Sequence, residues 1–386
     1  MREIYLDHAA TTPLREEVLE AMLPYLTQEF GNASTVYSWG RRARQALGTA
    51  RDEVAALLHA APEEVVFTSG GSEGANLAIK GTAWANRDKG KHIITSAIEH
   101  NAVLDAVEWL ERNAGFSVTI LPVDGEGTVQ PETVKKALRP DTILVSIMHA
   151  NNEVGTIQPI GEIGEIVRSH GAIFHTDAVQ TAGALDLDVK QLNVDLLSLS
   201  AHKFYGPKGV GALYVRKGVR IQPLIHGGAQ ERRRRAGTEN VAGIVGLARA
   251  FALAQAEREE EGKRLMALRD RLIAGLSEIP ATKINGSLEN RLPNNVNVCF
   301  EYVEGESLLL NLDLLGIAAS SGSACSSGSL EPSHVLLAMG LSHEIAQGSV
   351  RLTLGRKTSE SDIDFVLKEL PQIVERLRAM SPLYNA

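Results

Sequence analysis

The stretch Ser198-Leu-Ser-Ala-His-Lys-Phe-Tyr-Gly-Pro-Lys-Gly209 places Lys203 between an apolar run and a glycine-rich turn. The apolar run, residues 194–199, is short and bounded by polar residues, which predicts a buried strand. Burial near other cations lowers the pKa of an ammonium group and frees the amine as a nucleophile, as in a lysine that forms a Schiff base. This stretch alone leaves an ordinary loop lysine as an open alternative.

Composition narrows the class of protein. The chain has 386 residues, of which 44% are hydrophobic and 22% charged, as is usual for a soluble globular enzyme of two domains. Its net charge of −8 gives no overall attraction to nucleic acid or anionic lipid. We find no apolar span that could cross a membrane and no secretory signal. Cys299 and Cys325 have neither a CxxC nor a zinc spacing, so we expect a reducing cytoplasm.

Strand-like and helix-like segments alternate through the first two-thirds of the chain. The helical pattern at 41–58, for example, repeats alanine, leucine and valine on one face. This alternation predicts an α/β domain with a largely parallel, covered sheet. The predicted strands are 64–68, 92–96, 118–121, 143–149, 172–176, 194–200 and 211–215.

The last third predicts a smaller α+β unit. Residues 241–279 have a helical composition without proline, and the charge-rich part 257–264 is typical of a solvated stretch between domains. We therefore expect a large domain over 15–255 and a small domain formed by 1–14 and 256–386. The small domain has predicted strands at 295–300, 317–320 and 350–354, and predicted helices near 306–315 and 360–380.

Ligands of α/β sheets bind outside the carboxyl ends of the strands, where several motifs of this chain fall. Residues 68–74, Thr-Ser-Gly-Gly-Ser-Glu-Gly, can hold a phosphate or simply cap a helix. His100 can stack on a planar ring or be satisfied by hydrogen bonds. Asp177, with Gln180 close behind, can keep a ring nitrogen protonated or serve as a helix cap. With Lys203, these motifs together suit pyridoxal phosphate.

The other decisive stretch is 319–332, Ala-Ser-Ser-Gly-Ser-Ala-Cys-Ser-Ser-Gly-Ser-Leu-Glu-Pro. Its small, flexible residues are typical of a mobile loop. Cys325 in such a loop is accessible and can act as a thiolate, although an incidental cysteine fits the loop equally well. Cys299 lies within an apolar alternation and is interpreted as a core thiol.

Together these motifs resemble the cysteine desulfurases of the NifS/IscS type, among the fold-type-I pyridoxal-phosphate enzymes. The resemblance implies a large domain with a mainly parallel seven-stranded sheet plus a smaller α+β domain. The extended cysteine loop is similar to that of the group that hands sulfur to partner proteins. The matching segments cover nearly the whole chain: 5–13, 30–34, 99–100, 151–155, 175–180, 200–203, 234–240, the cysteine loop and 350–355.

The same resemblance implies a role for each site residue. Lys203 would form the Schiff base and move the substrate α-proton. Cys325 would attack the sulfur of L-cysteine, leaving L-alanine and a persulfide. Arg351 would grip the substrate carboxylate, with Asn152 beside the ring. The cofactor contacts would come from His100 on the ring, Asp177 on its nitrogen, Gln180 on its hydroxyl, and Gly71, Ser72, Ser200 and His202 on the phosphate, with Thr238 reaching in from the other subunit of a homodimer.

Two departures from that family accompany the match. Gly71-Ser72 stands where many members have Ala-Thr or Thr-Thr, but Ser72 keeps a hydroxyl for the phosphate. Asn101 replaces a common proline, which affects local backbone shape rather than chemistry. The arginine run 232–235 could suggest nucleic acid, but in an acidic protein ion pairs or an interface are favoured.

The leading hypothesis is therefore a cysteine desulfurase whose sulfur goes to an acceptor protein of iron–sulfur cluster assembly or of tRNA thiolation. We expect no intrinsic metal site, although Cys325 could ligate a transient iron–sulfur cluster, and no direct contact with membrane or nucleic acid. A selenocysteine lyase or another aminotransferase-like enzyme would keep the cofactor without needing Cys325. A non-catalytic scaffold is a third reading, and the intact Lys203, Asp177 and His100 argue against it.

Overall fold

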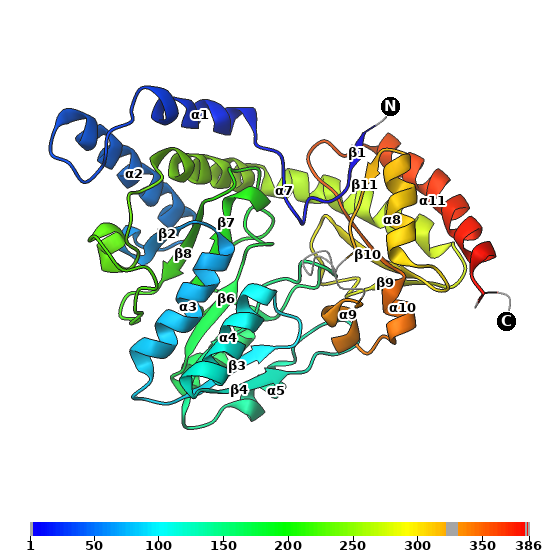
Figure 1. Cartoon of the computed structure of the whole chain (residues 1–386), viewed down its shortest axis with the longest axis horizontal. Coiled ribbons are helices and arrows are strands. Elements are labelled where there is room, and N and C mark those ends of the chain that lie inside the picture. The colour runs from blue at the N-terminus through cyan, green and yellow to red at the C-terminus, as the bar shows by residue number, and fades with distance from the viewer. Residues whose placement is uncertain (1–2, 322–330, 383, 385–386) are drawn as a thin grey trace.

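A computed structural model describes residues 3–321, 331–382 and 384 (Figure 1). Its largest sheet has seven strands in the order β2-β8-β7-β6-β5-β3-β4. Strands β3 to β7 pair in parallel, and β8 runs antiparallel to both β2 and β7. The predicted mainly parallel sheet of seven strands is confirmed. The strands are β2 (Val65–Thr68), β3 (His92–Ser96), β4 (Ser117–Leu121), β5 (Thr142–Ser146), β6 (Ile173–Asp177), β7 (Leu196–Ser200) and β8 (Gly211–Val215).

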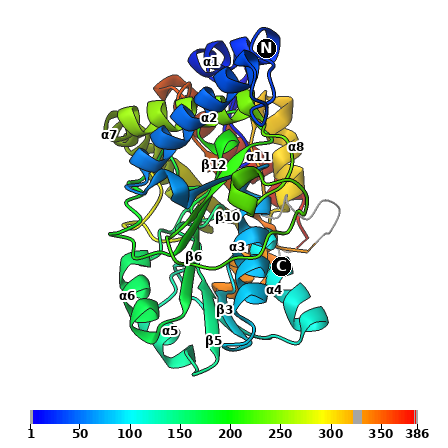
Figure 2. The same cartoon turned by 90° about the vertical axis from the view of Figure 1, so that its left-hand side faces the viewer.

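Helices cover both faces of this sheet, which is why its central strands are buried throughout. Figure 2 shows α3 and α4 on one side and α5 and α6 on the other. Apolar side chains of α3 and α4 pack with β3 and β5 in one cluster, while α2, α5, α6 and the start of α7 share a second cluster with the opposite face. The helices are α1 (Glu16–Thr27), α2 (Ser38–Leu57), α3 (Gly71–Asn86), α4 (Asn101–Ala114), α5 (Pro131–Ala137), α6 (Ile160–His170) and α7 (Val241–Ser277), with short 3-10 turns η1 (Pro62–Glu64), η2 (Ala201–Lys203) and η3 (Gln230–Arg233).

The C-terminal part builds a smaller α+β layer with its own apolar cluster. An antiparallel sheet has the order β12-β10-β9, and the N-terminal strand β1 pairs in parallel with β11. Among the described residues, no helix combines the length and the apolar character that a membrane crossing requires. The elements are β1 (Ile4–Tyr5), β9 (Thr282–Asn285), β10 (Asn295–Phe300), β11 (Ile317–Ala318), β12 (Ser349–Thr353), α8 (Gly305–Leu314), α9 (His334–Ala338), α10 (His343–Gln347) and α11 (Glu360–Met380).

The seven-stranded sheet and the three-stranded sheet are linked by α7, which runs unbroken from one to the other (Figure 1). The proposed domain boundary at 255/256 falls inside this helix, and the division into two domains stays a prediction. The stretch 257–264, which was expected to be solvated, is exposed or half-exposed, but some of its charges are paired. Glu257 pairs with Arg15 at 2.8 Å, and Arg264 donates to the Gly355 carbonyl oxygen at 3.0 Å, so these charges join segments far apart in the chain.

Candidate active site

A cavity of about 320 Å³ opens at the carboxyl ends of the central parallel strands. Ten of the residues predicted from sequence line it: Gly71, Ser72, His100, Asn152, Asp177, Gln180, Ser200, His202, Lys203 and Arg351. The structure therefore brings together segments that are up to 280 positions apart (351 − 71). Residues that sequence reasoning missed complete the lining: Asp7, Ala9, Ala10, Ala102, Met148, Ala150, Val179 and Ser320.

Lys203 ends the short turn η2, directly after β7. It is half-buried, and its Nζ donates to the carbonyl oxygens of Ala9 at 2.5 Å and Ala10 at 2.7 Å. The N-terminal segment thus holds the lysine by two main-chain acceptors. This position favours a fixed lysine over an ordinary solvated one, and the Schiff-base role of Lys203 stays a prediction.

Asp177 is the last residue of β6 rather than the first residue after it. Its Oδ1 accepts from the Val179 amide at 2.9 Å. Desolvation by burial raises the pKa of this carboxyl, while the hydrogen bond from the Val179 amide and the nearby positive charge of Lys203 act to lower it. A buried carboxylate of this kind can stabilise a protonated ring nitrogen placed in the cavity.

His100 caps the N-terminus of α4, with its Nδ1 accepting from the Ala102 amide at 3.0 Å. This bond leaves Nδ1 without a proton and fixes the ring at the cavity wall. The preceding residue, Glu99, is fully buried, and desolvation raises its pKa to about 8. Its Oε1 accepts from Ser96 Oγ at 2.6 Å and from the Met148 amide at 2.9 Å, which ties the turn before α4 to the segment after β5.

The segment between β2 and α3 forms one end of the cavity. Gly70 adopts a φ of +155°, a conformation that favours glycine, and a Cβ on Gly71 would lie 2.7 Å from Val179 Cγ2. These glycines let the first turn of α3 approach the neighbouring strand ends. Amide groups at a helix N-terminus, with hydroxyls nearby, are a suitable site for a phosphate. Burial, together with Lys203, lowers the pKa of His202 to about 4, so it is neutral near pH 7.

Arg235 supports this segment from outside. Its guanidinium pairs with Glu73 at 2.9 Å, and the Glu73 carboxylate also accepts from the Ser69 amide at 2.7 Å. The expectation of ion pairs for the arginine run 232–235 is thereby confirmed for Arg235. Thr238, on the same loop, is exposed and does not line the cavity, so its predicted contribution from a second subunit stays a prediction.

Arg351 forms the opposite end of the cavity, on β12. Its side chain is 5% exposed, and Nη2 pairs with Asp7 Oδ1 at 2.8 Å. Nη1 donates to the Asn152 carbonyl oxygen at 3.1 Å. The buried Nε has no hydrogen-bond partner among the described residues. A guanidinium held in this way can bind a carboxylate at its remaining N–H groups.

Cys325 lies outside the described residues. Before residues 322–330, Ser320 lines the cavity; after them, Ser333 and His334 bond to residues that are next to lining residues in the sequence. Ser320 exchanges main-chain hydrogen bonds with Arg351, at 3.2 Å and 2.6 Å. Ser333 Oγ bonds to the Glu153 carboxylate, and His334 Nε2 lies 3.0 Å from the Glu99 carbonyl oxygen.

The other cysteine behaves as a core thiol, as predicted. Cys299 is buried on β10, and Asn285 Nδ2 lies 3.1 Å from its sulfur. Burial raises the pKa of this thiol to about 11. It is therefore a poor nucleophile at neutral pH. Within the described ranges, no group of three or more His, Cys, Asp or Glu side chains is arranged to hold a metal ion.

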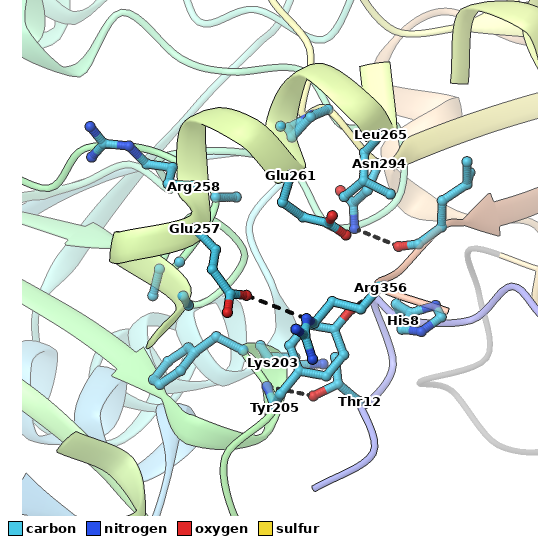
Figure 3. Close-up of a pocket in the computed structure, with 18 of the residues that line it drawn as sticks. His8, Thr12, Lys203, Tyr205, Glu257, Arg258, Glu261, Leu265, Asn294 and Arg356 are labelled. Carbon is cyan, nitrogen blue, oxygen red and sulfur yellow. Dashed lines mark hydrogen bonds and ion pairs between the residues drawn. The ribbon is translucent and has the colours of Figure 1, made fainter. Parts of the chain in front are cut away.

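A second, smaller cavity of about 80 Å³ adjoins the first, and Lys203 and Gln180 line both. Figure 3 shows it between the middle of α7 and the segment that follows Lys203. Arg356 reaches across it to Glu257 at 3.3 Å. No sequence motif pointed to this cavity, because its two glutamates, Glu257 and Glu261, come from the part of α7 that was expected to be solvated.

Comparison with known proteins agrees with this architecture. A family model, aminotransferase class-V, matches residues 4–366. The chain is 61% identical over 382 residues to "Cysteine desulfurase IscS" of Methanosarcina thermophila, covering 99% of this chain and 94% of the relative. A solved "NIFS-like protein" is 41% identical, with a TM-score of 0.92 over 97% of this chain and 100% of the other.

A further solved structure, "SspA in complex with cysteine", is 41% identical, with a TM-score of 0.80 over 91% of this chain and 98% of the other. The expected fold-type-I architecture and the family resemblance are confirmed by these matches. The chain belongs to the aminotransferase class-V family, and within it to the proteins of the NifS/IscS type.

Proposed function

We propose that this protein is a pyridoxal-phosphate-dependent cysteine desulfurase, which converts L-cysteine to L-alanine and carries the sulfur as a persulfide on Cys325. The observation that supports this most is the single cavity in which Lys203, Asp177 and Arg351 converge. The full-length similarity to proteins named cysteine desulfurase points to the same reaction.

The cavity fits pyridoxal phosphate. Its volume, about 320 Å³, is within the range of about 300–1,000 Å³ for small-molecule pockets. Asp177 would pair with the ring nitrogen, Lys203 would hold the aldehyde carbon, and His100 would lie against the ring. The phosphate would be held by Gly71, Ser72, Ser200 and His202, and the ring hydroxyl by Gln180. The cofactor supplies an electron sink for a carbanion at the substrate Cα.

The chain itself would do the positioning and the proton transfer. Arg351 would bind the α-carboxylate of the amino acid, with Asn152 beside the ring. Lys203 Nζ would take the α-proton as a general base and return a proton to the product. Both groups are already oriented by neighbouring main-chain carbonyls, which lowers the entropic cost of reaching the reactive geometry.

Cys325 would supply the second nucleophile. Its thiolate would form a bond to the substrate sulfur while the substrate Cβ–Sγ bond breaks, and protonation of Cβ then leaves alanine. This role rests on the loop sequence and on the family. Cys299 is unsuited to it, because the thiol is buried and its pKa is raised to about 11.

The reaction is tested by measuring alanine and sulfide from L-cysteine in the presence of a thiol reductant. We expect the wild-type protein and Cys299→Ser to form both products and Cys325→Ser to lose sulfide release. Cys299→Ser is a matched control, since it removes the other cysteine. Full sulfide release by Cys325→Ser would contradict the proposal, and so would inactivity confined to Cys299→Ser.

The same proposal includes a homodimer in which Thr238 reaches the partner's cavity. Large apolar side chains are exposed on α1, on the segment between α1 and α2, and at the start of α2, as a second copy would require: Leu19, Leu23, Leu26, Phe30, Val36 and Trp39. Light scattering should give twice the chain mass. Mixing Lys203→Ala with Thr238→Ala protomers should recover cofactor affinity in a minority of sites if Thr238 acts in trans, and recover none if it does not.

The persulfide would then pass to an acceptor protein, of iron–sulfur cluster assembly or of tRNA thiolation. Such a transfer needs reduced thiols on both proteins, which supports a cytoplasmic location. Radiolabelled sulfur from cysteine should move from Cys325 to a co-purified acceptor thiol, and label that stays on the enzyme with each acceptor would contradict this step.

A further inference from the structure

Asp7 stands at the junction of the substrate end and the lysine end of the cavity. It lies two residues after the end of β1 and forms a bridge to Thr353 on β12. Its carbonyl oxygen accepts from the Ala10 amide at 3.0 Å, so it starts the turn whose carbonyls hold Lys203. Its side chain points the other way, to Arg351.

The contact with Arg351 is a close ion pair inside the cavity lining. Asp7 Oδ1 lies 2.8 Å from Arg351 Nη2, and the two side chains are 20% and 5% exposed. The Asn152 carbonyl oxygen takes one N–H of Nη1 at 3.1 Å. The guanidinium is therefore fixed through both terminal nitrogens, while Nε is left without a partner among the described residues.

We propose that Asp7 is a positioning residue for substrate binding, which orients Arg351 so that its unused N–H groups face the α-carboxylate of the amino acid. An arginine has five N–H donors in a rigid plane, and two fixed contacts determine the direction of the others. Without Asp7, the long side chain could rotate, and the carboxylate would have to order it again on binding.

The main-chain and side-chain roles of Asp7 are separable. The turn that holds Lys203 uses only the Asp7 carbonyl oxygen, which every substitution except a backbone change retains. Replacing the side chain should therefore weaken recognition of the carboxylate and leave the cofactor lysine in place. Asparagine keeps an oxygen that can accept from Nη2, so its effect should be smaller than that of alanine.

This inference rests on the proposed function, and its test does not need turnover. The cofactor-loaded protein is titrated with L-alanine by calorimetry. Because a hydrogen bond to a charged group contributes about tenfold or more in affinity, Asp7→Ala should raise the Kd for L-alanine about tenfold and Asp7→Asn about threefold. In L-cysteine assays KM should rise in parallel, with kcat changed by less than about threefold.

The matched control is Asp270→Ala, because Asp270 pairs with the similarly buried Arg269 at 2.8 Å away from the cavity. Its Kd for L-alanine should stay within about twofold of wild type. Ethylamine, which lacks the carboxylate of L-alanine, should bind wild type and Asp7→Ala equally.

An L-alanine Kd that is unchanged or lower in Asp7→Ala would overturn the inference. If that variant does not fold, Asp7→Asn decides: a raised Kd supports the inference and an unchanged one overturns it. Failure of the proposed function would look different. The wild-type protein would then make no alanine or sulfide from cysteine, while the Kd for L-alanine would still rise from wild type to Asp7→Asn to Asp7→Ala.

Discussion

Replacing Glu99 with glutamine should make the stability of this protein less dependent on pH. Glu99 is fully buried beside the cavity, and desolvation is the main reason that its pKa rises from 4.5 to about 8. Its Oε1 accepts from Ser96 and Met148, whereas the buried Oε2 has no partner among the described residues. Glutamine has the shape of the protonated acid and cannot ionise.

The direction follows from proton linkage. Between pH 4.5 and about 8, the folded protein keeps the Glu99 proton, while the unfolded chain loses it. The wild-type protein therefore loses stability as pH rises through this window, at about 1.4 kcal/mol for each pH unit. From pH 5.5 to 7.5 the loss is about 2.7 kcal/mol at most. A chain of this length has an unfolding entropy on the order of 0.8 kcal/mol/K, so the loss equals roughly 3 °C in Tm.

Differential scanning calorimetry at pH 5.5, 6.5 and 7.5 measures this effect as the Tm of Glu99→Gln minus that of wild type. We expect the difference to grow steadily with pH, by up to roughly 3 °C. Glu132→Gln, an exposed position on α5, serves as the control and should give a constant difference. A difference for Glu99→Gln that does not change with pH, or that shrinks, would refute the raised pKa.

Two further substitutions test the supports of the cavity. Arg235→Ala removes the ion pair with Glu73, whose carboxylate accepts from the Ser69 amide. The Kd for pyridoxal phosphate should therefore rise by about tenfold in Arg235→Ala, and by less in Arg235→Lys. Equal affinities of wild type and Arg235→Ala in a spectroscopic titration would contradict this. Ser333→Ala removes the cap of α9 and the bond to the Glu153 carboxylate, so the free energy of unfolding should fall by about 1 kcal/mol. Because Ser333 follows the segment that carries Cys325, kcat should fall as well. Ser359→Ala removes a similar cap on α11 and should lower the free energy of unfolding by as much, with kcat unchanged. An equal loss of kcat in both variants would show that kcat does not depend on the contacts of Ser333.

Most of the large sheet was predictable, because its strands are short apolar runs covered on both faces. The run 194–200 became β7, Leu196–Ser200, with each residue buried. The same rule failed at 143–149, where β5 ends at Ser146 although Ile147 and Met148 are buried. An apolar run predicts that a segment is buried, but a buried irregular segment can have the same composition as a strand. Composition therefore does not show where the strand ends.

The cavity residues at strand ends were predictable for a geometric reason, since parallel strands end at one edge of the sheet. The contacts that the N-terminal segment makes with Lys203 and Arg351 were not predictable. Ala9 and Lys203 are 194 residues apart, and a carbonyl oxygen has no sequence signature. Asp7 resembles any polar residue after a short strand, and only the position of β12 reveals its pairing with Arg351. The strand β9, Thr282–Asn285, was missed because a polar edge strand lacks an apolar run.

Reduction of the purified protein with borohydride, followed by proteolysis and mass spectrometry, tests most directly whether Lys203 carries the cofactor. The reduced bond is stable, so the pyridoxyl mass marks the lysine that held the aldehyde. We predict this mass on the peptide that contains Lys203 and on no other lysine. A pyridoxyl group on the neighbouring Lys208, or a yellow protein without any modified lysine, would contradict the account.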